Sequence, residues 1–261
     1  MPSEKQKNWL GYTETKNNLA IRIEANKKYT DIKLEDWLFR NLAVKKNNVL
    51  LDIGCGSGNL FPIFSKKLGA SGMIVGLDQS SELLAEAQKT KIKTRKILMR
   101  WDMNQEFPFL ADNFDGIIST FAIYYVDNVS VMTQEMRRVL KTGATVILLG
   151  PGDGNARELY EFNNRVFSIT KDEKISLRSS RLEKEFYPAM KRIFKKVSIQ
   201  TIPINLVFPN KKEFLRYYLA TLLYEESVKK TGVVPQPQQL LEMKLSSLKI
   251  SKEVVVVRGT K

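Results

Sequence analysis

Short apolar runs alternate with helical patterns between residues 48 and 150. We predict strands at 48–54, 72–78, 96–102, 114–121 and 144–150, and helices at 59–69, 80–89 and 129–143. Strands that alternate with helices are typical of a parallel sheet covered by helices. Ligands of such sheets bind beyond the carboxyl ends of the strands. We therefore expect Asp52, Asp78 and Asp102, which lie at or near three of these ends, to share one crevice.

The pattern changes after residue 150. The predicted elements are helices at 156–169, 180–194 and 211–226, strands at 195–208 and 252–259, and a proline-containing loop at 231–239. One apolar stripe follows the second of these helices and consists of Leu182, Phe186, Met190 and Phe194. The first 45 residues carry mostly helical patterns.

Composition restricts the possible chemistry. The chain has no histidine and a single cysteine, Cys55. It therefore lacks the residues for a Ser-His-Asp triad, a Cys-His pair, an internal disulfide or a Cys- or His-rich metal site, and we expect no metal. A general base, if the chemistry needs one, must be Asp, Glu, Tyr or Lys.

The formal net charge is +14, and the basic residues include the runs 89–100 and 191–196. Such charge can attract nucleic acid, an anionic membrane or an acidic small molecule. Lysines are spread through most of the chain, however, so we favour solvated faces for both runs. No apolar run approaches the roughly 18 residues of a membrane span. The first ten residues lack the apolar core of a signal peptide, and we expect a cytoplasmic protein.

A glycine-rich turn lies between the first predicted strand and its helix. It reads VLLDIGCGSGNL, with Gly54, Gly56 and Gly58 in the spacing G-x-G-x-G. The dinucleotide fingerprint is G-x-G-x-x-G instead. Asp78, at the end of the next strand, can accept hydrogen bonds from both ribose hydroxyls of a nucleoside. Asp52 suits a cofactor with a cationic head better than a pyrophosphate, which points to S-adenosylmethionine.

These segments together resemble the class I S-adenosylmethionine-dependent methyltransferases, of the small-molecule type. The resemblance rests on VLLDIGCGSG, GLDQS, RWDMNQEFPF, FDGIISTFAIYYV and RRVLKTGATVILL, in the family's order. It implies a doubly wound, mostly parallel α/β sheet of seven strands with helices on both faces and an antiparallel last strand. It also implies one domain over 1–261, made of a helical lid (1–45), a Rossmann-like cofactor core (46–150), a helical insert or lid (151–196) and a closing strand–helix–strand segment (197–261).

The resemblance also implies which residues bind the cofactor. They are Tyr29, Asp52, Gly54, Cys55, Gly56, Gly58, Asp78, Gln79, Asp102, Met103 and Thr120. In the family's pattern Asp52 helps to fix the loop and the ammonium group, Asp78 binds the ribose, and Asp102 accepts from the adenine amino group. Asp102 has an alternative reading as a loop or cap aspartate. We expect the thiol of Cys55 to be inert.

The methyl acceptor is not fixed by these motifs. We expect a small molecule, with a weak preference for an anionic one, held by the aromatic-rich lid segments. Tyr125, Asp153 and Tyr187 are weak candidates for catalysis, although a surface or packing position explains each of them as well. The family often has a histidine at the position of Tyr124 or Tyr125, and proline and glycine at those of Thr142 and Ala144.

Three other functions stay open on the sequence. An RNA or protein methyltransferase would use the basic runs. A protein that binds the cofactor without catalysis would keep the same motifs. An NAD-linked dehydrogenase is the most distant alternative, because the glycine spacing disagrees with it.

Overall fold

The computed structural model of this chain describes residues 15–169 and 179–261. The chain divides into two compact units. The sheet unit comprises 34–151, 180–201 and 255–261, and the helical unit comprises the described residues among 1–33, 152–179 and 202–254. The organisation as one methyltransferase domain with lid segments stays a prediction.

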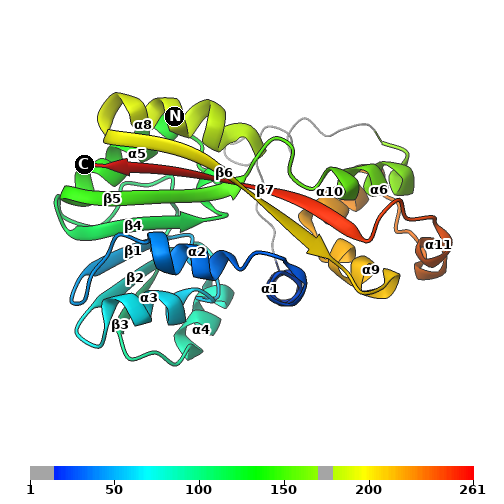
Figure 1. Cartoon of the computed structure of the whole chain (residues 1–261), viewed down its shortest axis with the longest axis horizontal. Helices are drawn as coiled ribbons and strands as arrows, with labels where there is room; N and C mark the ends of the chain where they lie inside the picture. Colours follow the sequence, from blue (N-terminus) through cyan, green and yellow to red (C-terminus); the bar gives the residue numbers. More distant parts are fainter. Residues whose placement is uncertain (1–14, 170–178) are drawn as a thin grey trace. The chain divides into compact units, whose positions relative to one another are not determined.

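A sheet of seven strands carries the fold, in the order β3-β2-β1-β4-β5-β7-β6 (Figure 1). The strands are β1 (Val49–Ile53), β2 (Met73–Asp78), β3 (Arg95–Arg100), β4 (Phe114–Thr120), β5 (Leu140–Pro151), β6 (Lys195–Val207) and β7 (Lys249–Thr260). The first five strands pair in parallel, and β7 is antiparallel. The predicted sheet and its reversed last strand are therefore confirmed. The unit boundary falls within both β6 and β7.

Helices cover both faces of the sheet within the sheet unit. They are α2 (Leu34–Asn41), α3 (Phe61–Leu68), α4 (Ser81–Lys89), α5 (Val129–Val139) and α8 (Tyr187–Ile193), with the short turns η2 (Ile123–Tyr125) and η3 (Leu182–Phe186). Figure 1 shows α2, α3 and α4 on one face and α5 and α8 on the other.

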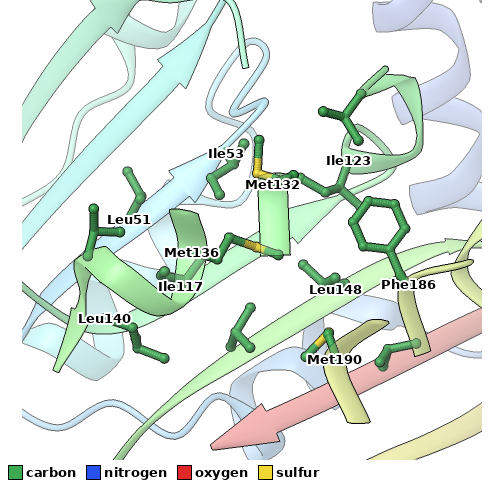
Figure 2. Close-up of a cluster of buried hydrophobic side chains, with 14 of the residues drawn as sticks. Leu51, Ile53, Ile117, Ile123, Met132, Met136, Leu140, Leu148, Phe186 and Met190 are labelled. Atoms are coloured by element: carbon green, nitrogen blue, oxygen red, sulfur yellow. The ribbon is translucent and has the colours of Figure 1, made fainter. Parts of the chain in front are cut away.

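The main core lies between the sheet and the helices α5 and α8 (Figure 2). Leu51, Ile117 and Leu148 from three parallel strands pack there against Met136 and Phe186. The predicted stripe of Leu182, Phe186, Met190 and Phe194 is buried in this same core. The second half of the segment predicted as an insert thus covers the sheet, because its apolar stripe is what the sheet needs on this face.

The prediction of a helix over 129–143 is wrong after Val139. Helix α5 ends there, and Leu140 instead begins β5, opposite Phe114 of β4. The side chain of Leu140 is fully buried. Strand pairing and burial decide the backbone at this point, whereas helical periodicity alone continues the helix.

The closing segment also differs from its prediction, because three helices lie between its two strands. The helix predicted at 211–226 is two helices, α9 (Lys211–Leu219) and α10 (Leu222–Thr231). Thr221 separates them: its hydroxyl donates to the carbonyl of Tyr218 at 2.6 Å and accepts from the amide of Tyr224 at 3.2 Å. The third helix, α11 (Pro237–Glu242), begins inside the predicted loop, at a proline that needs no helical amide bond.

The helical unit has its own core. Its helices α1 (Lys16–Tyr29), α6 (Arg157–Phe167), α9, α10 and α11 enclose a cluster of aromatic side chains. At its centre the buried Asn163 accepts from the hydroxyl of Tyr218 at 2.8 Å and donates to that of Ser227 at 2.9 Å. Within residues 15–169 and 179–261, no helix is long and apolar enough to cross a membrane.

Candidate functional site

The glycine-rich loop follows β1, and its glycines are required by its shape. Gly54, Gly56 and Gly58 have φ of 73°, 54° and 68°, in the left-handed region that favours glycine. A Cβ on Gly54 would lie 2.2 Å from the Cβ of Ala122, and one on Gly58 would lie 2.7 Å from the ring of Phe61. The loop can therefore follow this path only with glycine at both positions.

The amides of this loop bond to the protein itself. The amides of Gly54 and Cys55 both donate to the carbonyl of Leu77, at 2.8 and 2.9 Å. That of Gly56 donates to Asp78 Oδ2 at 2.8 Å, and that of Gly58 donates to the Cys55 carbonyl at 3.1 Å. A loop that cradles a pyrophosphate instead offers free amides to the anion. This arrangement disfavours a dinucleotide.

Asp52 is the most unusual group of the site. Its side chain is only 2% exposed, and its Oδ1 has no hydrogen-bond partner among the described residues. Burial is the larger cause and the charge of Asp78 the smaller one, and together they raise the pKa of Asp52 to about 8. A buried carboxylate oxygen without a partner is costly unless a ligand completes its bonding. The ammonium of S-adenosylmethionine fits that requirement, because it is a cation with several N–H donors.

Asp78 links the glycine loop to the next helix. Its Oδ2 accepts from the Gly56 amide, and its Oδ1 accepts from the amide of Ser80 at 2.9 Å. Burial raises the pKa of Asp78, and these backbone amides act in the opposite direction. Each carboxylate oxygen can accept a second hydrogen bond, so ribose hydroxyls can still be bound. The ribose assignment stays a prediction.

The residues after β3 bring two loops together. Asp102 is exposed, and its Oδ1 accepts from the amide of Asn104 at 2.9 Å. Asn104 Oδ1 in turn accepts from the amide of Asp127, after β4, at 2.7 Å. The first bond agrees with a loop aspartate and leaves the second oxygen of Asp102 for an adenine amino group, so both interpretations remain. Met103 Cε lies 3.9 Å from the ideal Cβ position of Gly54, beside the glycine loop.

Two other predicted cofactor residues lie at these strand ends. The Gln79 carbonyl accepts from Arg100 Nε at 3.1 Å. Thr120 ends β4 and pairs with Leu149 of β5. Cys55 lies within the loop and is buried, and burial raises the pKa of its thiol, with the Asp52 and Asp78 carboxylates acting in the same direction. The thiolate is the reactive form of cysteine, so this thiol is expected to be inert.

Sequence reasoning missed Arg181, which holds the turn after β4. The residue is 2% exposed, and its Nη1 donates to the carbonyls of Tyr124 and Val126 at 2.8 and 2.5 Å. Its Nε and Nη2 bond the two carboxylate oxygens of Glu185 at 2.9 and 2.8 Å. The sequence signal was present but weak: an arginine on an apolar helix, four residues before a glutamate.

The catalytic candidates lie in different surroundings. Tyr125 is half-buried in η2, with its ring centroid 4.7 Å from that of Tyr124. Tyr187 packs against the main core, and Lys191 Nζ lies 5.5 Å from its ring centroid. Asp153 belongs to the helical unit and is exposed. A catalytic part for any of the three stays a prediction.

Tyr29, the predicted lid contact, also belongs to the helical unit. Its hydroxyl donates to Glu213 at 3.1 Å, and its ring packs against Phe208 at 5.5 Å between centroids. These bonds account for its burial within that unit. Its contact with a cofactor stays a prediction.

Part of the first basic run has a structural use. Lys96 Nζ donates to the carbonyls of Ala87, Gln88 and Thr90 at 2.9, 2.6 and 2.7 Å, and so satisfies the end of α4. Burial lowers the pKa of Lys96. Arg100 also donates to a backbone carbonyl, that of Gln79. Lys96 and Arg100, two cations of the run, therefore have structural hydrogen bonds within the fold.

Comparison with known proteins agrees with this geometry. Residues 51–148 match the family model of the methyltransferase domain. This stretch is thus a methyltransferase domain of the class I S-adenosylmethionine-dependent type. The methyl donor of this family is S-adenosylmethionine. The matched residues include the glycine loop, Asp52, Asp78, Asp102 and Thr120.

Curated relatives of this chain carry names that refer to quinones. The 2-phytyl-1,4-naphtoquinone methyltransferase of Synechocystis sp. is 37% identical over 120 residues, which are 43% of this chain and 50% of that protein. The demethylmenaquinone methyltransferase of Staphylococcus aureus is 29% identical over 112 residues, 43% of this chain and 46% of that protein. The chain thus spans about half the length of the curated relatives it matches.

Solved structures share the fold at low identity. A candidate methyltransferase from Bacillus halodurans has a TM-score of 0.58 at 13% identity, covering 87% of this chain and 98% of that chain. The YcgJ protein of Bacillus subtilis has a TM-score of 0.57 at 18% identity, covering 87% of this chain and 97% of that chain. At these identities the likeness extends to the fold alone.

Proposed function

We propose that this protein transfers the methyl group of S-adenosylmethionine to an oxygen, nitrogen or carbon atom of a small-molecule acceptor and leaves S-adenosylhomocysteine. The observation that carries the proposal is the buried Asp52 carboxylate, which lacks a partner for Oδ1 within the described residues and lies at the strand end that leads into the glycine loop. A cationic cofactor head supplies what this group lacks. The match of residues 51–148 to the methyltransferase family model supports this proposal.

When bound, S-adenosylmethionine supplies a methyl group already activated by its sulfonium. The chain then has to bind the cofactor and the acceptor, orient them towards each other and exclude water from the site. Asp52 balances the charge of the ammonium, and Asp78 fixes the ribose while its Oδ2 holds the Gly56 amide. Rigid placement of the cofactor lowers the barrier to methyl transfer, because its orientational freedom is already lost before the transition state is reached. The hydrogen bonds of Asp78, Ser80 and Leu77 supply that rigidity.

A small molecule is the favoured acceptor for two reasons. The curated relatives are named for naphthoquinone and menaquinone substrates. In addition, Lys96 and Arg100 of the first basic run are bonded within the fold, which reduces the positive surface left for nucleic acid. No general base is assigned, since an activated methyl group needs one only for some acceptors.

The experiment is transfer of labelled methyl groups from S-adenosylmethionine into cell extract that is then separated into nucleic acid, protein and small-molecule pools. We expect label in the small-molecule pool with the wild type and none with Asp78→Ala. Label confined to RNA or protein would replace the proposed acceptor class. If no pool takes up label while the wild type binds S-adenosylhomocysteine, the protein binds the cofactor without using it, and the proposal is wrong.

A further inference from the structure

A buried guanidinium group holds the turn after β4. Arg181 is only 2% exposed, and its Nη1 donates to the carbonyls of Tyr124 and Val126 at 2.8 and 2.5 Å. Its Nε and Nη2 donate to the two carboxylate oxygens of Glu185. A buried ion pair adds little net stability compared with well-packed apolar side chains. Stability alone therefore does not explain why an arginine occupies this position.

The same turn touches two of the loops assigned to the cofactor. At its start, an ideal Cβ on Gly54 would lie only 2.2 Å from the Cβ of Ala122. At its end, the amide of Asp127 donates to Asn104 Oδ1 at 2.7 Å, and the Asn104 amide donates to Asp102 Oδ1 at 2.9 Å. The two carbonyls bound by the guanidinium group lie between these contacts along the chain. A shift of the turn would therefore reach both cofactor loops.

The backbone of the turn is strained at its first residue. Phe121 has a φ of 55°, in the left-handed region that bulky side chains rarely adopt. Its amide donates to the carbonyl of Leu149 at 2.8 Å, and the amide of Tyr125 donates to the carbonyl of Ala122 at 3.0 Å. Such a conformation persists only where the surrounding structure holds it. The bonds from Arg181 add to this support.

The segment that supplies Arg181 is fitted closely against the turn. Leu182, the next residue, begins the π-helical turn η3. An ideal Cβ on Gly150, near the end of β5, would lie 2.7 Å from Leu182 Cδ1 and 3.0 Å from Tyr124 Cδ1. The three residues thus pack together with no room for a larger side chain at Gly150. Single turns of π-helix occur frequently at functional sites.

We propose that Arg181 is a positioning residue of the methyl-donor site. It fixes the turn after β4 and, through that turn, the distance between the glycine loop and the loop that carries Asp102. The inference rests on the proposed function and adds to it a residue outside the matched stretch 51–148. Arginine suits this task because its rigid fork bonds several acceptors at once, whereas lysine presents a single ammonium group.

Arg138 offers a matched control at the opposite edge of the sheet. Its Nη1 and Nη2 donate to the carbonyls of Phe109 and Phe107 at 2.7 and 3.1 Å. Its Nε donates to Glu135 at 2.8 Å, so the residue holds a loop by the same kinds of bond. The Arg138 carbonyl accepts from the amide of Asp112, just before β4 begins. The glycine loop instead lies at the carboxyl ends of the parallel strands.

The test titrates S-adenosylhomocysteine by calorimetry into the wild type, Arg181→Met, Arg181→Lys and Arg138→Met. Thermal unfolding is measured for each protein, and every titration is done well below its melting temperature. We expect both methionine variants to lose stability. Arg181→Met should bind S-adenosylhomocysteine roughly tenfold more weakly than the wild type and Arg181→Lys about threefold more weakly, whereas Arg138→Met should stay within about twofold of it.

A purely structural role predicts that affinity follows stability and not position. Equal affinity in all four proteins would therefore overturn the inference, and so would an equal loss in Arg181→Met and Arg138→Met. If Arg181→Met does not fold, the lysine variant decides, and wild-type affinity in that variant overturns the inference. These failures are distinct from failure of the proposed function, in which the wild type itself does not bind S-adenosylhomocysteine.

Discussion

Replacing Asp52 by asparagine should change how the stability of the unliganded protein depends on pH. The pKa of Asp52 is about 8 in the folded protein, against an ordinary value of 3.8. A carboxyl whose pKa is raised on folding keeps its proton longer in the folded state, so stability falls as the pH rises from about 4 to about 8. The shift of about four pH units corresponds to at most about 6 kcal/mol.

Asparagine cannot ionise, so the variant escapes this loss. Its amide leaves a buried donor unsatisfied, which costs about 1–3 kcal/mol at every pH. We therefore expect Asp52→Asn to be less stable than the wild type at pH 4, where almost none of this loss has occurred, and more stable, by about 3–5 kcal/mol, at pH 8.5. Because the sign of the difference changes with pH, the stability curves of the wild type and Asp52→Asn should cross. For a chain of this size each kcal/mol moves the melting temperature by roughly 2–4 °C.

The assay is thermal and urea unfolding of cofactor-free protein between pH 4 and 9. Asp36→Asn, at an exposed carboxylate in the first turn of α2, is the matched control and should show an offset that does not change with pH. Saturating S-adenosylhomocysteine should flatten the slope of the wild type, because its ammonium favours ionised Asp52. If wild type and Asp52→Asn keep a constant difference across the range, Asp52 does not titrate there and the reasoning is refuted.

Three further substitutions test the site and its support. Asp78→Ala should weaken binding of S-adenosylhomocysteine by about 10²–10⁴-fold, since two charge-assisted bonds to the ribose contribute roughly 1.5–3 kcal/mol each; calorimetry that finds wild-type affinity would show the ribose assignment to be wrong. Gly54→Ala should destabilise the protein by about 1–3 kcal/mol more than Gly143→Ala, because both sites have positive φ but only Gly54 has a neighbour in the way, whereas Gly143 has no atom within 4 Å. Equal melting temperatures for the two glycine variants would contradict the close approach to Ala122. Arg181→Met should cost at least about 2 kcal/mol in urea unfolding, because it leaves the carbonyls of Tyr124 and Val126 without their donor. Glu185→Gln should cost less than about 1 kcal/mol, because Glu185 is 43% exposed; a larger loss in the glutamate variant would reverse this account of the pair.

The cofactor core could be predicted from the sequence because its signals are local. Most of the parallel strands are centred on an apolar run bounded by turn residues, and the glycines with positive φ are the residues that such a turn requires. Asp52 and Asp78 follow from the same pattern, since parallel strands end at one edge of the sheet. Non-local effects account for the errors. Leu140 joins a strand because β4 pairs with it, and helical periodicity carries no information about that partner.

The details of the site depend on contacts that no periodic pattern contains. The Asp52 oxygen without a described partner, the inward-turned amides of the glycine loop and the approach of Ala122 to Gly54 each join residues from different elements. Arg181 donates to the Tyr124 carbonyl in the turn after β4, although the two residues are 57 positions apart in the sequence. The backbone of Phe121 is left-handed because bonds on both sides hold it there, whereas its residue type predicts an extended or helical conformation.

The most direct test of the account is calorimetric titration of the purified protein with S-adenosylhomocysteine and, in parallel, with NADH. The Asp52 oxygen has no partner among the described residues, and the amides of the glycine loop already donate within the protein. These features predict one tight site for S-adenosylhomocysteine, lost in Asp78→Ala, and no binding of NADH. Binding of NADH without binding of S-adenosylhomocysteine would contradict the central claim, because the loop would then hold a pyrophosphate.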